Sequence, residues 1–215
     1  MTKLNILYED NHVLVCIKPF NVPSQEDASG DEDMLTLLKA YLKEKYQKPG
    51  NVYLGLVHRL DRPAGGVMVF AKTSKAASRL SEQVRTGKLD KEYTLCCAKP
   101  PQPLSGTMED YLVKDNAHNT VRTCAKNTPG AKIARLAYQT LKTRADGTAL
   151  VQVSLFTGRS HQIRVQFASR GCPLLGDARY GAGGQQLALW STRLAFDHPT
   201  TKERLAFSSP PPKIW

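Results

Sequence analysis

The spacing of hydrophobic positions along the chain has two periods, and the period separates expected helices from expected strands. Apolar residues that recur three and four positions apart predict helices over residues 34–46, 74–85 and 161–170. Short apolar or alternating runs predict strands at residues 4–8, 13–17, 52–57, 67–71, 91–98, 135–141, 150–156, 187–190, 193–196 and 204–207. Many hairpin-like strands with few helices favour an α+β fold, built on a mixed, mainly antiparallel sheet with flanking helices.

Turn-forming residues mark the ends of these elements. Ser74 and Ser160 are the expected N-caps of the second and third helices, and Gly87 is the expected stop of the second. Residues 176–184 carry four glycines and are expected to form a loop, and the polar residues 114–130 a loop or an irregular hairpin. No stretch has the composition of a linker, so we expect residues 1–215 to form a single domain.

Charge indicates a polyanionic partner. Thirty Lys and Arg residues against nineteen Asp and Glu residues give a formal net charge of +11. Five of the acidic residues lie within residues 26–33, so the rest of the chain is more basic than the total indicates. A basic surface attracts polyanions because binding releases their counterions. We therefore expect nucleic-acid binding, although a basic composition can also serve solubility alone.

Cysteine spacing and hydropathy give the expected compartment. None of the five cysteines belongs to a C-x-x-C pair, so buried, reduced thiols are the expectation. The N-terminus has no signal-peptide core, and no apolar run approaches the length that crosses a membrane. These features predict a soluble cytoplasmic protein.

A single carboxylate stands out in the stretch VHRLDRPAGGVMVFAKT, residues 57–73. Asp61 follows an apolar run, has His58, Arg59 and Arg62 as neighbours, and precedes a Pro-Ala-Gly-Gly turn and a second apolar run. Loops held between rigid strands are where catalytic groups tend to lie. An aspartate at the start of a turn can also be purely structural.

A second polar cluster lies about a hundred residues further on. Arg159, His161, Gln162 and Arg164 fall at the expected start of the third helix, where free backbone N–H groups and the helix dipole attract anions. The alternative is an ordinary solvated helix cap. If this helix start faces Asp61, Arg164 would lower the pKa of the carboxyl group and fix its direction.

Several ordered motifs resemble those of the RluA-type pseudouridine synthases. His58-Arg59-Leu60-Asp61 resembles the family's HRLD motif, and Lys91-Glu92-Tyr93 its K-x-Y motif. GRSHQIRV at residues 158–165 is similar to its GR-[ST]-HQ-[IL]-R-V motif. Leu175-Gly176-Asp177 and the C-terminal pattern ending at Pro210 also fit. One departure is Ala64-Gly65-Gly66, which stands where members usually have Thr-Ser-Gly.

The resemblance implies a pseudouridine synthase fold with a central RNA-binding cleft, in a short member with a single catalytic domain and no extra N-terminal RNA-binding domain. Asp61 would attack the ribose or assist departure of the base, which rotates and rejoins through its ring carbon 5. Tyr93 would stack on the flipped uracil, and Arg164 would form a salt bridge with Asp61. Ile163 would press on the base, and Arg59 would fill the gap that the uridine leaves in the RNA.

The resemblance also implies the partners of the enzyme. Arg62, Arg159, His161 and Gln162 would add RNA contacts. The substrate would be a structured rRNA or tRNA stem-loop, bound by a monomer without an obligate protein partner. No cofactor and no metal ion are expected.

Two other function classes remain open from the residues alone. A non-catalytic RNA-binding module could keep the same fold, with Tyr93 as an ordinary strand aromatic. A metal-dependent nuclease or phosphoryl-transfer enzyme could use His58, Asp61 and His161 as ligands. The metal-dependent alternative is disfavoured, because cations crowd the position that a metal ion would occupy.

Overall fold

The most apolar stretch of the sequence forms a strand that is buried along its whole length. In the computed structural model, which describes residues 4–213, strand β4 (Gly65–Ala71) has only buried residues. It pairs antiparallel with β2 (Val13–Lys18) along one edge and with the two-residue β3 (Gly55–Leu56). The prediction of a strand covered on both faces is confirmed.

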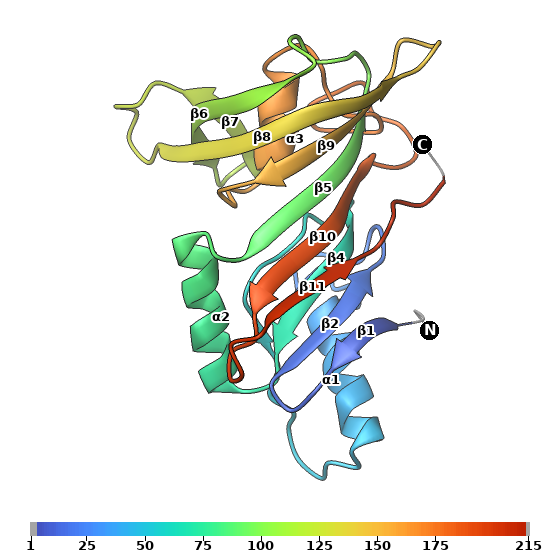
Figure 1. Cartoon of the computed structure of the whole chain (residues 1–215), viewed down its shortest axis with the longest axis vertical. Helices are drawn as coiled ribbons and strands as arrows, with labels where there is room; N and C mark the ends of the chain where they lie inside the picture. The colour runs from blue at the N-terminus through green and yellow to red at the C-terminus, as the bar shows by residue number, and fades with distance from the viewer. Residues whose placement is uncertain (1–3, 214–215) are drawn as a thin grey trace. The chain divides into compact units, whose positions relative to one another are not determined.

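Two compact units make up the described chain, and Figure 1 shows the strands of each. The first holds the described residues through Asp90 together with Ser191–Pro210, and the second holds Lys91–Trp190 and residues 211–213. In the first unit the strand order is β1–β2–β4–β10, with β3 on β4 and β11 on β10. The bounds not yet given are β1 (Asn5–Glu9), β10 (Leu189–Asp197) and β11 (Arg204–Ser208).

Two helices belong to the first unit, and both begin at a side-chain cap. Helix α1 (Met34–Lys45) starts after Asp33, whose carboxylate accepts hydrogen bonds from the N–H groups of Leu35 and Thr36. Helix α2 (Ser74–Thr86) starts after Thr73 and ends at Gly87, which adopts the left-handed conformation expected of a C-cap glycine. The predicted cap Ser74 is wrong by one position, because the Thr73 hydroxyl accepts the N–H of Ala76.

The core of the first unit lies between α2 and the sheet. Apolar side chains of β2, β4 and β10 pack there against Ala76 and Leu80 of the helix. The β1–β2 hairpin predicted from the apolar runs is confirmed, with Asp10 accepting the N–H groups of His12 and Val13 in the turn. The loop that carries Asp61 leads directly into this packed β4.

The second unit is an antiparallel sheet with one short helix. The strands are β5 (Asp90–Cys97), β6 (Ser105–Asp115), β7 (Thr120–Cys124), β8 (Lys132–Thr143) and β9 (Ala149–Leu155), in the order β5–β9–β8–β6–β7. Helix α3 (Gln162–Ala168) covers one face, where Val165 packs on Leu112, Val121 and Ala134. The glycine-rich loop at 176–184 is confirmed.

Four local predictions need correction. For residues 114–130 the hairpin alternative is confirmed, but the β6–β7 hairpin is regular and not irregular. The strand predicted at 52–57 shrinks to Gly55–Leu56. The two strands predicted at 187–196 are one strand, β10. Ser160 does not cap α3: the cap is His161, which adopts a left-handed backbone with φ of 51° and makes no side-chain cap hydrogen bond.

The observed elements confirm the α+β class, while the single-domain assignment stays a prediction. All five cysteines are free, with four buried and Cys124 half-buried. Between residues 4 and 213, no helix is both long enough and apolar enough to span a bilayer.

Candidate active site

The backbone on both sides of Asp61 is held by side chains from distant parts of the first unit. Ser24 is buried, and its hydroxyl donates to the Leu60 carbonyl at 2.9 Å and accepts the Leu60 N–H at 3.2 Å. The N–H of Ala64 donates to the Asp61 carbonyl at 3.0 Å and closes the turn. The half-buried Asp61 therefore sits on a fixed loop.

Lys18 supplies the second anchor of this loop. Its side chain is fully buried, and its ammonium donates to the carbonyls of Pro19 at 2.9 Å, Val22 at 2.6 Å and Arg62 at 3.0 Å. Three acceptors match the three N–H donors of an ammonium group. Burial lowers the pKa of Lys18 to about 7, and the negative charge of Asp61 opposes this shift. Neither Lys18 nor Ser24 was a sequence-based candidate, because Lys18 ends an apolar run and Ser24 opens a polar loop far from Asp61 in the sequence.

In the predicted turn at Ala64-Gly65-Gly66, the two glycines are instead the start of β4, and they fit a close approach between two strands. Gly66 has φ of 120°, and a Cβ built on it would lie 2.5 Å from the backbone nitrogen of Ser191 in β10. The Ser191 hydroxyl donates to the Val67 carbonyl at 3.1 Å and holds the two strands together there. Glycine is required at this position for both reasons, conformation and space. Ala64 is buried, so the departure from Thr-Ser-Gly places an apolar side chain inside the fold.

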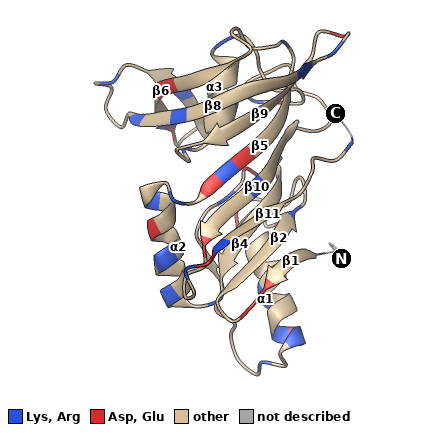
Figure 2. Ribbon diagram, viewed as in Figure 1, with Lys and Arg blue, Asp and Glu red and all other residues tan. Residues whose placement is uncertain are grey.

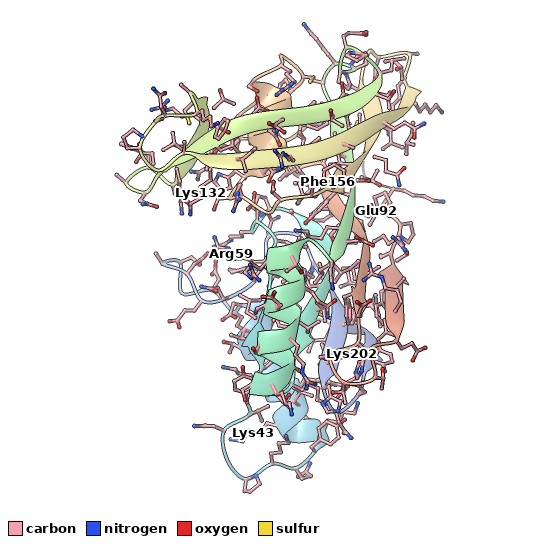
Figure 3. All side chains as sticks on the ribbon, turned by 60° about the vertical axis from the view of Figure 1, so that its left-hand side comes forward. Lys43, Arg59, Glu92, Lys132, Phe156 and Lys202 are labelled. Atoms are coloured by element: carbon pink, nitrogen blue, oxygen red, sulfur yellow. The ribbon has the colours of Figure 1, made fainter. Side chains whose placement is uncertain are left out.

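The other residues around Asp61 differ in exposure. Arg59 is exposed on the loop before β4, where Figure 3 labels its side chain. Arg62 is half-buried, and its guanidinium contacts residues of the 21–31 segment. His58 accepts the N–H of Val69 at its Nε2 atom, at 3.1 Å, which ties the loop to β4.

In the second unit, Arg164 forms a buried ion pair with Asp177. The Nε and Nη2 atoms donate to the two carboxylate oxygens at 2.8 and 2.7 Å, and both side chains are almost completely buried. Burial alone would raise the pKa of Asp177, but the hydrogen bonds and charge of Arg164 hold it below its usual value. Asp177 also accepts the N–H groups of Arg179 and Tyr180. Asp177 belongs to the motif Leu175-Gly176-Asp177, but the motif did not indicate that Asp177 pairs with Arg164.

His161 and Tyr180 complete the surroundings of this pair. The Nδ1 atom of His161 lies 2.7 Å from the Tyr180 hydroxyl, and their rings meet edge to face. The guanidinium of Arg164 lies 5.1 Å from the centre of the Tyr180 ring, within cation–π range. Tyr180 therefore fixes both a ring nitrogen and a guanidinium at the start of α3.

Gln162 organises the turn that precedes α3. Its amide oxygen accepts the Thr157 hydroxyl at 2.7 Å and the Arg159 N–H at 3.1 Å. Its amide nitrogen donates to the Arg135 carbonyl and to Gln166, and the side chain is buried. The structure thus gives Gln162 a structural task, while its RNA contact stays a prediction.

Tyr93 shares one face of the strands of the second unit with α3. It lies opposite Val153 of β9, which in turn lies opposite Tyr138 of β8. Side chains paired in this way project to the same face, and the Tyr138 ring packs edge to face on Phe167 of α3. Tyr93 and Ile163 are both buried.

Arg159 is exposed, and its Nε donates to the Ile133 carbonyl at 2.9 Å. Next to it, burial and the charge of Arg159 lower the pKa of the buried Lys91. The predicted polar residues 159–164 thus make two sets of contacts: Arg159 with Gln162, and His161 and Arg164 with Tyr180. The expected pair between Asp61 of the first unit and Arg164 of the second stays a prediction.

Metal ligands do not gather anywhere in residues 4–213: no three His, Cys, Asp or Glu side chains there could hold one ion. The cationic groups found around Asp61 and at α3 are poor surroundings for a metal ion.

Comparison with known proteins places the chain in a family. A sequence model described as RNA pseudouridylate synthase matches residues 12–169. The uncharacterised RNA pseudouridine synthase YhcT of Bacillus subtilis is 34% identical over 215 residues, which cover 98% of this chain and 69% of that protein. The dual-specificity RNA pseudouridine synthase RluA of Escherichia coli is 31% identical over 215 residues, covering 96% of this chain and 93% of RluA.

Solved structures give the same fold. The human RNA pseudouridylate synthase domain containing 4 protein matches with a TM-score of 0.80 at 24% identity, over 97% of this chain and 89% of that one. The human RNA pseudouridylate synthase domain containing 1 protein matches with a TM-score of 0.74 at 23% identity, over 98% of this chain and 84% of that one. Fold, motifs and relatives agree: the chain belongs to the RluA-type RNA pseudouridine synthases, isomerases that convert uridine in RNA to pseudouridine.

Proposed function

We propose that this enzyme isomerises a specific uridine of rRNA or tRNA to pseudouridine, by flipping the base and using Asp61 as the catalytic carboxylate. The observation that carries the proposal is the loop around Asp61, which Ser24 and Lys18 hold on either side. A carboxylate that must act on a ribose carbon needs a fixed position, because misplacement by about 1 Å can cost on the order of 100-fold in rate.

The proposed roles divide the reaction among four side chains. Asp61 attacks the ribose or assists departure of uracil, which turns and rejoins through its ring carbon 5. Tyr93 stacks on the flipped base, and Arg164 pairs with ionised Asp61 while Ile163 presses on the base. Flipping costs a few kcal/mol, and stacking on an aromatic ring returns roughly 1–3 kcal/mol. The guanidinium of Arg164 has five N–H donors, of which Asp177 takes two, so binding Asp177 is compatible with the proposed pair.

RNA binding in this proposal rests on charge. Lys and Arg residues occur on elements of both units, including α2 and β8 (Figure 2), and the chain carries +11 overall. Arg59 fills the gap in the RNA, and four further residues bind the substrate: Arg62, Arg159, His161 and Gln162. The proposed enzyme is a cytoplasmic monomer that binds a structured stem-loop, without cofactor or metal.

The test compares the wild-type enzyme with Asp61→Asn on in-vitro transcribed rRNA and tRNA, with pseudouridine measured by nucleoside chromatography. Asp61→Asn should abolish pseudouridine formation and leave RNA affinity within about twofold, since the substitution keeps the shape of the side chain. Glu32→Gln, at an exposed carboxylate, is the control and should keep full activity. A wild-type enzyme that binds RNA but makes no pseudouridine in either RNA would favour the non-catalytic module.

Two further measurements separate the remaining alternatives. RNA affinity should fall steeply with salt, because each neutralised phosphate releases counterions, and a flat response would contradict RNA binding. Pseudouridine formation should persist in EDTA, whereas loss of activity would favour the metal-dependent class. Mapping pseudouridines in cells with and without the gene then identifies the target uridine.

A further inference from the structure

An acidic segment in this basic protein lies against the residue that follows Asp61. We name residues 26–33 the acidic segment; it holds five carboxylates. The Asp31 carboxylate accepts a hydrogen bond from Nη2 of Arg62, and the Ser29 hydroxyl accepts one from Nη1 at 2.8 Å. A carboxylate oxygen of Asp27 lies 3.8 Å from Nη1. The Nε atom donates to the Asn21 carbonyl at 3.2 Å, so all three guanidinium nitrogens contact this part of the chain.

Local hydrogen bonds give the acidic segment its shape. The N–H and hydroxyl of Ser29 both donate to Asp27, at 2.9 and 2.6 Å, and the Asp31 N–H donates to the Ser29 hydroxyl at 3.2 Å. The Gly30 N–H donates to the Asp27 carbonyl, and Gly30 takes a left-handed φ of 72°. The result is a tight turn that presents two carboxylates and a hydroxyl to one guanidinium.

Both carboxylates stay ionised in this arrangement. Hydrogen bonds from Ser29 hold the pKa of Asp27 below its usual value. The hydrogen bond from Arg62, followed by that from Ser29, does the same for Asp31. The guanidinium of Arg62 therefore has two ionised carboxylates beside it, and a guanidinium binds phosphate as well as carboxylate.

Exposure makes this contact easy to exchange. The side chains of Arg62, Asp27 and Asp31 are 40%, 41% and 56% exposed. Ion pairs at such positions contribute little to stability, because water screens both charges. The contact therefore does little to hold the fold, and it costs little to replace with another anion. Glu26 and Glu32, in the same segment, are exposed carboxylates as well. Among the described residues, neither of them forms a hydrogen bond or an ion pair with Arg62.

We propose that the acidic segment is a built-in competitor for Arg62, which an RNA phosphate displaces when the substrate binds beside Asp61. The inference rests on the proposed function for the identity of the polyanion. In the free enzyme, Asp27, Ser29 and Asp31 occupy the phosphate position. An RNA that places a phosphate at Arg62 replaces the carboxylate contact of Arg62 with a phosphate contact. An RNA that places no phosphate there is instead repelled by the acidic segment. The segment thus weakens binding of RNA with the wrong shape more than binding of the substrate.

The test is a double-mutant cycle with charge-matched variants. Asp27→Asn with Asp31→Asn and Glu26→Gln with Glu32→Gln each remove two negative charges, but only the first pair touches Arg62. Affinity is measured for in-vitro transcribed tRNA and rRNA by filter binding at fixed salt. The first pair should bind RNA about three- to tenfold more tightly than the second, the size expected for two exposed ion pairs. In an Arg62→Gln background this difference should vanish, since the competitor then has no target.

Three results would overturn the inference. Equal gains in RNA affinity for the two charge-matched pairs of substitutions would show that only long-range electrostatics acts. A gain that persists in the Arg62→Gln background would place the competition elsewhere. Weaker binding by the Asp27→Asn, Asp31→Asn pair would mean that the segment positions Arg62 for RNA instead of blocking it. Thermal unfolding of each variant checks that the fold is kept. The binding measurements need no catalytic turnover. If the enzyme made no pseudouridine, the proposed function would be contradicted, but the double-mutant cycle would still test the competition for Arg62.

Discussion

The ammonium of Lys18 donates to the carbonyl oxygen of Arg62 at 3.0 Å, so a fully buried charge holds the residue next to Asp61. The same ammonium binds the carbonyls of Pro19 and Val22. It thereby joins the end of β2, the loop that follows it and the turn before β4. The position of Asp61 thus depends on a side chain 43 residues earlier in the sequence.

Replacing Lys18 tests how much this contact stabilises the fold. Lys18→Met keeps the length of the side chain but leaves three carbonyls without their donor, which should lower the free energy of unfolding by about 3 kcal/mol or more. Lys43→Met, at an exposed position on α1, should change it by less than about 0.5 kcal/mol. Urea unfolding of the three proteins measures the difference. Similar midpoints for the two variants would show that the Lys18 contacts contribute nothing.

Gly66 is expected to tolerate no side chain. A Cβ there would collide with the Ser191 backbone, and the φ of 120° is strained for other residues, so Gly66→Ala should destabilise the enzyme by roughly 2 kcal/mol or more. Gly50→Ala is the control, because its Cβ would meet nothing within 4 Å. Thermal unfolding reports both variants. A Gly66→Ala enzyme as stable as the control would mean that β4 and β10 can separate at little cost.

Acid stability should depend on Glu9. Burial by itself raises the pKa of Glu9, but hydrogen bonds from Lys45, Lys72, Tyr46 and Tyr41 lower it to about 2. Because the pKa is lower in the folded state, this stabilisation is complete above pH 4.5 and is lost as the pH falls towards 2. A shift of this size corresponds to about 3 kcal/mol.

The measurement is the free energy of unfolding between pH 6 and pH 2, for wild type and Glu9→Gln. The difference between the two proteins should be largest at pH 6 and shrink in acid. Glu82→Gln serves as the exposed control, and its difference from wild type should stay small throughout. A Glu9→Gln difference that does not change with pH would contradict the assignment.

Breaking the Arg164–Asp177 pair should affect both stability and activity. Asp177→Asn leaves a buried guanidinium without its countercharge, which should cost about 3–5 kcal/mol of stability. Activity at a temperature where the variant is folded should fall by on the order of 10–100-fold, because Arg164 loses its fixed direction. Glu109→Gln, which breaks the exposed pair between Glu109 and Arg135, should cost at most about 1 kcal/mol and leave activity near wild type. Equal losses in the two variants would argue against a positioning role for Asp177.

Secondary structure was predictable where the signals act within a few residues. The apolar run of β4 and the helical spacing of α1 and α2 led to the correct elements, because side-chain periodicity depends only on local geometry. The prediction of secondary structure failed where the conformation of a segment depends on a distant part of the chain. The apolar residues 52–57 form only a two-residue strand, since strand length depends on which strand lies alongside. His161 takes a left-handed backbone at a place where the sequence indicated a regular helix, and its ring contacts Tyr180, nineteen residues later.

The family, the α+β class and the two polar clusters that contain Asp61 and Arg164 can be identified from the amino-acid order alone. These are properties of short motifs and local patterns, which are readable without the path of the chain. The folded chain adds which groups meet: Arg164 with Asp177, Lys18 with the Arg62 carbonyl, the acidic segment with Arg62, and Gly66 with Ser191. Such pairs depend on the fold that brings distant residues together, and their strength depends on the burial that the same fold creates.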